Sequence, residues 1–135
     1  MGWETIDLRD VSPFGETVPE GVYTFNLLGA AFDERNPAQL NVRAAITTDG
    51  EFQGRRMRIT YPDPLEYPWS AQALKRLELA IGVDQQPGEN VIGWLNRAAN
   101  ATFRATVFHD SYFVDGEEKP RVRAKVRQFS VEPGV

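Results

Sequence analysis

The sequence predicts a mainly β protein with one central helix. Five segments have apolar residues at alternate positions, which is the period of side chains that share one face of a strand. A single segment between the third and fourth of these instead has apolar residues spaced by three and four, as on the buried face of a helix. With 135 residues, no cysteine and no internal repeat, the chain is expected to fold around one core without disulfides.

The first three strands are expected at residues 21–32, 39–48 and 55–61. In each of them apolar and polar residues alternate, and residues 48–50 supply the Thr-Asp-Gly turn between the second and the third strand. The third strand should end before Pro62, because proline cannot donate a ladder hydrogen bond.

The helix is expected at residues 70–81, where Leu74, Leu77 and Ile81 share one face and Gly82 follows as a C-terminal stop. Residues 91–99 fit either a short helix or an irregular connection. Both readings leave the segment as part of the link between the third and the fourth strand.

Two further strands are expected at residues 101–111 and 120–131, joined by an exposed tip. Three strands, a helix and two strands are the order of a five-stranded, OB-like Greek-key barrel with its helix between strands 3 and 4. A three-stranded sheet followed by a helix and a separate hairpin would give the same order. Residues 21–131 are expected to form the domain, and residues 132–135 a short tail.

The N-terminal residues 1–20 are expected to be a lead-in that packs on the body through Trp3, Ile6 and Leu8. No apolar run approaches the ~20 residues that span a bilayer, and no secretion signal is recognisable at the N-terminus. The sequence therefore predicts a protein without membrane attachment, in the cytoplasm.

Catalytic and metal-binding patterns are missing from the sequence. It has no cysteine and a single histidine, His109, so neither a thiolate site nor a multi-histidine metal site can form. No glycine-rich phosphate loop and no nucleophile elbow occurs. We therefore expect no enzymatic activity, no metal and no cofactor.

Residues 121–127 alternate cations with small apolar residues. Val122, Ala124 and Val126 should face the core, and the four cations should lie exposed on the opposite face. The whole chain is acidic, with 15 Lys and Arg against 19 Asp and Glu, so positive charge is concentrated on one strand. Such a face is typical of a polyanion site, most often for nucleic acid. A solvated edge strand that its charges protect from aggregation explains the pattern equally well.

Several features occur together along residues 18–131. They are the Gly-Val-Tyr-Thr-Phe start of the first strand, the alternating second strand, the Gly-Arg-Arg start of the third, the Leu74/Leu77/Ile81-Gly82 helix and the basic last strand ending near Phe129. In these features the chain resembles the small single-stranded-DNA-binding proteins of bacteriophage and prophage replication or recombination modules. The resemblance implies an OB-type fold and a role in DNA replication or DNA recombination in the host cytoplasm. Replication or recombination proteins are then candidate partners, and a homo-oligomer stays open.

Sequence-independent binding of a single strand needs cations along the phosphates and aromatic rings on which bases stack, at about 1–3 kcal/mol per base. The expected nucleic-acid-binding residues are Arg55, Arg56, Arg58, Tyr61, Arg104, Phe108, Tyr112, Arg121, Arg123, Lys125 and Arg127. Phe113 is a further candidate ring, and Trp69 and Trp94 are weaker ones. For any one of these rings, packing in the core is the competing explanation.

A second hypothesis is a non-enzymatic assembly or interaction protein, such as a virion component or an adaptor, whose basic strand contacts an acidic protein partner. The arrangement of charge separates the two hypotheses. A binder of single strands requires the cations of the third and fifth strands to converge with exposed aromatic rings in one groove. An assembly protein does not.

Overall fold

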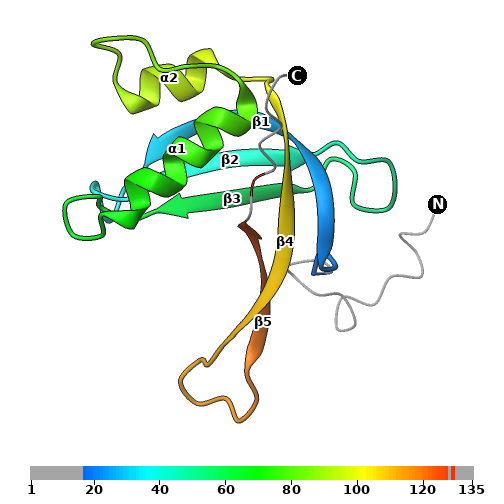
Figure 1. Ribbon diagram of the computed structural model, residues 1–135. Coiled ribbons are helices and arrows are strands. Elements are labelled where there is room, and N and C mark those ends of the chain that lie inside the picture. The colour runs from blue at the N-terminus through cyan, green and yellow to red at the C-terminus, as the bar shows by residue number, and fades with distance from the viewer. Residues whose placement is uncertain (1–16, 128, 130–135) are drawn as a thin grey trace, which may run out of the picture.

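We describe a computed structural model of the chain, which covers residues 17–127 and residue 129. Its strands are β1 (Gly21–Phe32), β2 (Leu40–Ile46), β3 (Arg56–Tyr61), β4 (Thr102–Tyr112) and β5 (Arg121–Arg127). They form one antiparallel sheet in the order β3-β2-β1-β4-β5 (Figure 1). Helices α1 (Trp69–Ile81) and α2 (Val91–Arg97) follow β3 and precede β4 in the chain. The prediction of a mainly β fold is confirmed, and α2 shows that the ambiguous segment is a short helix.

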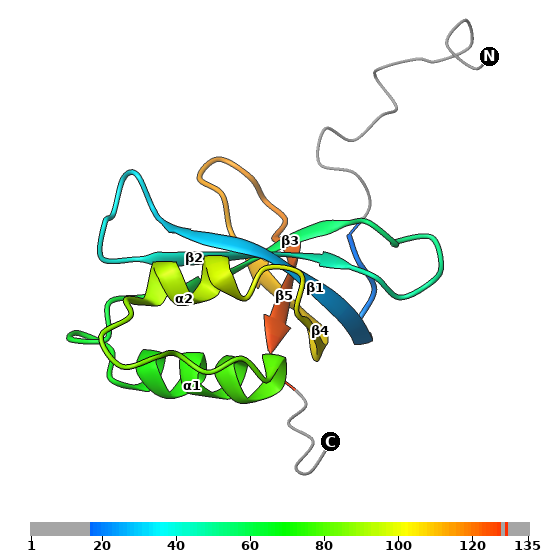
Figure 2. The same cartoon turned by 90° about the horizontal axis from the view of Figure 1, so that it is seen from above.

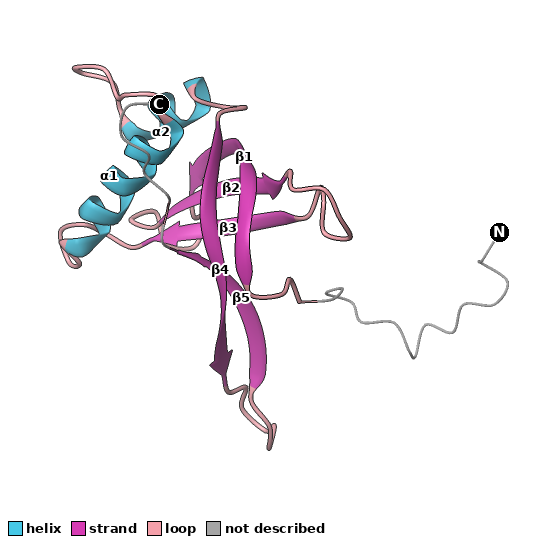
Figure 3. Cartoon of the chain, turned by 45° about the vertical axis from the view of Figure 1, so that its right-hand side comes forward, coloured by secondary structure: helices cyan, strands magenta, loops and turns pink. Residues whose placement is uncertain are grey.

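Strand β1 joins the two parts of the sheet. It pairs with β4 along residues 21–26 and with β2 along residues 25–32, and it bends across the molecule between them (Figure 3). A bulge interrupts its pairing with β2 between Leu27 and Gly29, where Gly29 has a φ of +148°. The side chain of Asn96 in α2 fits against this glycine and makes hydrogen bonds with the backbone N–H and C=O of Ala30 at 3.2 and 3.3 Å.

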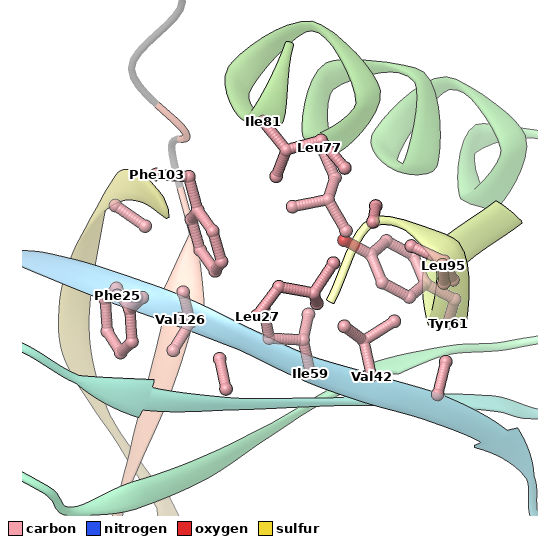
Figure 4. Close-up of a cluster of buried hydrophobic side chains, with 14 of the residues drawn as sticks. Phe25, Leu27, Val42, Ile59, Tyr61, Leu77, Ile81, Leu95, Phe103 and Val126 are labelled. Atoms are coloured by element: carbon pink, nitrogen blue, oxygen red, sulfur yellow. The ribbon is translucent and has the colours of Figure 1, made fainter. Parts of the chain in front are cut away.

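The core lies between the concave face of the sheet and the two helices, which run along the same side of the sheet (Figure 2). Leu27, Leu77 and Leu95 bring β1, α1 and α2 together and are fully buried (Figure 4). Phe103 of β4 stacks on Phe25 at a centroid distance of 5.4 Å and contacts Phe129 at 5.7 Å. Each such buried side chain stabilises the fold by about 1.5–3 kcal/mol.

The start of the described chain is attached to β4. Val18 is buried, and its carbonyl oxygen accepts a hydrogen bond of 2.7 Å from Nε2 of His109. Because a carbonyl can only accept, Nε2 carries the proton. The contacts predicted for Trp3, Ile6 and Leu8 lie outside the described residues.

The two edge strands of the sheet, β3 and β5, contact each other, so the sheet curls toward closure. Strands β4 and β5 also extend beyond the body as a hairpin (Figures 1 and 3). This projection corrects one expectation: Val122 is 51% exposed, because at its position the hairpin has no core to face. Ala124 is half-buried and Val126 is buried, as their places nearer the body require.

Candidate functional site

A groove lies where β3, β5 and α1 meet, with a volume of about 740 Å³. Its cationic and aromatic lining residues are Arg58, Trp69, Arg76, Phe108, Lys125 and Arg127. Ile59, Val126 and Phe129 form apolar parts of its wall. The groove therefore combines positive charge with apolar surface.

Strand periodicity explains why cations from β3 and β5 reach the same groove. On β3 the exposed Arg58 precedes the buried Ile59, and on β5 Lys125 and Arg127 flank the buried Val126. When the buried residues enter the core, their neighbours must point outward. Because β3 and β5 lie against each other, these outward cations meet at the contact between the two edges.

Helix α1 supplies the third wall. Trp69, Ala73 and Arg76 line the groove, and their spacing of four and then three residues places them on one helix face. This face lies beside the one that buries Leu77 and Ile81. The helix therefore covers the core with one side and borders the groove with another.

The electrostatics of the groove are those of a site for an anion. Four of its lining residues are cations, and none of the described lining residues is acidic. No carboxylate of the described residues forms an ion pair with Arg58, Arg76 or Arg127. No described carboxylate offsets the charge of these guanidinium groups, so an acidic chain carries a locally positive groove.

Carboxylates partly neutralise the cations on the projecting hairpin. Asp110 Oδ2 accepts hydrogen bonds from Lys125 Nζ at 3.1 Å and from Arg123 Nη2 at 3.2 Å. These bonds, that from Lys125 first, hold the pKa of Asp110 below its ordinary value. Arg121 forms an ion pair with Glu117 in the same way. The free positive charge of β5 is thus concentrated toward Arg127 at the groove.

The aromatic candidates differ in how much ring surface they offer. Trp69 is 55% exposed at the groove, whereas Phe108 is half-buried and the Arg127 guanidinium lies 4.2 Å from the centre of its ring. Trp94 is buried and donates its Nε1 proton to the carbonyl of Val83 at 2.7 Å. Phe113 is 74% exposed just beyond β4, away from the groove.

Tyr61 is a correction to the sequence-based expectation. Its side chain is only 4% exposed and lies among the core residues beneath α1, so neither ring face is available to a base (Figure 4). It sits at an inward position of β3, where alternation places an apolar residue. Its hydroxyl has no hydrogen-bond partner among the described residues, and burial raises its pKa above the ordinary value.

The structure divides the expected binding residues into two groups. Arg58, Phe108, Lys125 and Arg127 come together at the groove, with Tyr61 as a buried part of its wall. The residues that do not line it are Arg55, Arg56, Arg104, Tyr112, Arg121 and Arg123. Arg55 directly precedes β3 and Arg56 begins it, Arg104 pairs with Thr24 near the middle of the sheet, and the rest lie on the projecting hairpin.

Two groove residues were not expected from the sequence. Arg76 is not among the expected binding residues, and Trp69 is only a weak candidate ring. The spacing of Trp69, Ala73 and Arg76 could have shown that they share a face. The sequence contains no signal that this face borders β3 and β5.

The part of the chain that the structure describes contains neither a cluster of metal ligands nor a helix that could span a membrane. Within residues 17–127 and 129, no three acidic or histidine side chains gather as a metal site. None of the helices in this part is both long and apolar enough to cross a bilayer. No protein-family model matches the chain, and no curated protein is significantly similar to it in sequence.

Proposed function

We propose that the chain binds single-stranded DNA in the groove between β3, β5 and α1, largely independently of base sequence. The observation that carries the proposal is the convergence of four cations with accessible aromatic surface, in a groove whose described lining has no acidic residue. The cations can follow the phosphates, which every sequence shares. An aromatic ring can stack on any base, because every base has a π-face.

The sheet supports the finer fold assignment that this function suggests. Five antiparallel strands with neighbouring edges β3 and β5, and with helices between β3 and β4 in the chain, are compatible with an OB-like Greek-key barrel. We infer that the domain is of this type. Such barrels commonly bind oligonucleotides, so the fold and the groove favour the same function.

Single strands fit the groove better than duplexes do. A hollow of about 740 Å³ can receive the flat face of an unpaired base beside its phosphate. A duplex keeps its bases stacked inside the helix and offers the cations mainly phosphates. A preference for single strands would match a role in phage-type DNA replication or recombination, with proteins of those processes as partners.

The test compares single-stranded and duplex DNA. A fluorescently labelled dT oligonucleotide and a duplex of equal length are titrated with wild-type protein and with the variant Arg58→Ala/Arg127→Ala, and anisotropy reports binding. We expect the wild type to prefer the single strand and the variant to bind it much more weakly. The charge-matched control Lys119→Ala/Arg121→Ala changes two exposed cations away from the groove and should bind like the wild type.

Two results would overturn the proposal. One is a wild-type protein that binds neither substrate at low salt, and the other is a groove variant that retains wild-type affinity. The first result would favour the assembly hypothesis, and the second would place the DNA site outside the groove. One observation supports the assembly hypothesis, because the hairpin carries the exposed apolar side chains of Phe113 and Val122, 74% and 51% exposed, which a protein partner could cover.

A further inference from the structure

The connection from β3 to α1 exposes aromatic surface at the edge of the groove. Tyr67 is 42% exposed and Trp69 is 55% exposed, and their ring centres lie 6.1 Å apart with planes inclined by 59°. Folding normally buries much of a tryptophan ring, because its large apolar area is costly to leave in water. An exposed pair beside a cationic groove therefore indicates a surface that a ligand covers.

Hydrogen bonds fix the backbone of the segment that carries these two rings, and they do not require a ligand. The amide of Tyr67 donates to the carbonyl of Asp63 at 2.8 Å, and the amide of Ser70 donates to the carbonyl of Tyr67 at 2.9 Å. The buried Ser70 hydroxyl also donates to the carbonyl of Pro62 at 2.7 Å. Pro68, directly before Trp69, further limits the backbone. Binding would thus cost little ordering of this segment.

Trp69 has the most accessible ring among the described aromatic residues that line the groove. Tyr61 is buried, Phe129 is half-buried against Phe103, and Arg127 lies over the ring of Phe108. Trp69 is 55% exposed and shares its helix face with Arg76. A base on the Trp69 ring would therefore have a guanidinium on the same helix face for its phosphate.

We infer that Trp69, next to the tilted ring of Tyr67, is the stacking platform for an unpaired nucleobase at the α1 end of the groove. The inference rests on the proposed function, because it requires a nucleic-acid strand in the groove. It assigns the stacking role to α1 instead of to the rings of β3 and β4. Arg76 then holds the phosphate next to the stacked base.

Intrinsic fluorescence and affinity test this inference together. The chain has three tryptophans, so a Trp3→Phe background leaves only Trp69 and the buried Trp94 as reporters. In this background a dT oligonucleotide should quench the fluorescence, and the further change Trp69→Phe should abolish the quenching. Trp69→Ala should weaken binding by about 5- to 150-fold, the loss expected for one stacked base.

Controls separate stacking from folding and from charge. Phe113→Ala removes another exposed aromatic ring, outside the groove, and should leave affinity unchanged. Because Trp69 is largely exposed, Trp69→Ala should retain the wild-type circular dichroism and melting temperature. An oligonucleotide with abasic sites offers phosphates without bases, so wild type and Trp69→Ala should bind it equally.

The outcomes distinguish this inference from the proposed function. In one outcome the wild type binds the dT oligonucleotide, Arg58→Ala/Arg127→Ala weakens binding, and Trp69→Ala keeps full affinity. This outcome would support single-strand binding in the groove and would contradict base stacking on Trp69. Quenching that persists in Trp69→Phe would also contradict the platform. If the wild type does not bind the dT oligonucleotide, both proposals fail.

Discussion

The salt dependence of binding tests how many groove cations contact phosphates. On single strands, each neutralised phosphate contributes about −0.7 to the slope of log affinity against log salt. Four cations line the groove, so the wild type should have a slope of about −2.8 if each holds one phosphate. Arg58→Ala/Arg127→Ala leaves two of them, and the slope should fall to about −1.4.

These slopes predict a difference that is easily measured. Between about 50 mM and about 200 mM salt, the wild-type affinity should fall about 50-fold and that of the variant only about 7-fold. Anisotropy titrations of a labelled dT oligonucleotide at four salt concentrations give both slopes. No described carboxylate pairs with Arg58 or Arg127, and the contact of Arg127 with the Phe108 ring contributes about 0.5–1 kcal/mol, so the melting temperature of the variant should fall only slightly.

Two outcomes would refute the reasoning. If the variant loses affinity but keeps the wild-type slope, Arg58 and Arg127 do not neutralise phosphates, and the loss has another cause. If Lys119→Ala/Arg121→Ala flattens the slope as much as the groove variant does, the strand follows the projecting hairpin and not the groove. The first result rejects the role of two residues, and the second rejects the location of the site.

Three predictions concern the fold. Tyr61→Phe removes a buried hydroxyl that lacks a partner in the described part of the chain, so urea unfolding should show a stability raised by about 1 kcal/mol, and a loss would mean that the hydroxyl is bonded. Hydrogen bonds from Arg97 hold the pKa of Glu89 at about 2, which is below the pKa of this carboxyl in the unfolded chain. The ion pair therefore stabilises the fold fully at any pH above the unfolded-state pKa, and this stabilisation is lost as the pH falls toward 2. The melting temperatures of wild type and Glu89→Gln should therefore differ at pH 7 and converge in acid, and a constant difference would contradict this. Gly29→Ala should lower stability by about 1–3 kcal/mol in urea unfolding, because φ is +148° and the new Cβ would lie 2.7 Å from Asn96 Oδ1; an unchanged midpoint would show that the bulge relaxes.

The strands could be predicted because alternation is a local signal. β1 has the predicted bounds, Gly21–Phe32, and the other strands lie within their predicted segments or shifted by one residue. The burial of Val122 was predicted wrongly for a related reason. Alternation tells which face of a strand a residue occupies, but not whether another element covers that face. On the projecting part of the hairpin, nothing in the described structure covers it.

The groove could be predicted only in part. The cations of β3 and β5 are visible in the sequence, and the structure brings Arg58, Lys125 and Arg127 together. The part played by α1 could not be predicted, because the element that a helix face borders is decided by tertiary packing. Trp69 and Arg76 look like surface residues of an amphipathic helix until α1 is placed beside β3 and β5.

The position of the groove follows from the curl of the sheet and not from the basic strand alone. β5 carries a cation at every second residue from Arg121 to Arg127, but Glu117 engages Arg121, and Asp110 engages both Arg123 and Lys125. β3 and β5 line one groove around Ile59 and Val126, and there Arg58, Arg76 and Arg127 carry charge that no described carboxylate pairs with. A basic strand on a flat sheet would attract single strands and duplexes alike, because both carry phosphates. Joined to β3 and α1, the same strand also borders a hollow with aromatic surface, and this hollow is what favours an unpaired strand over a duplex.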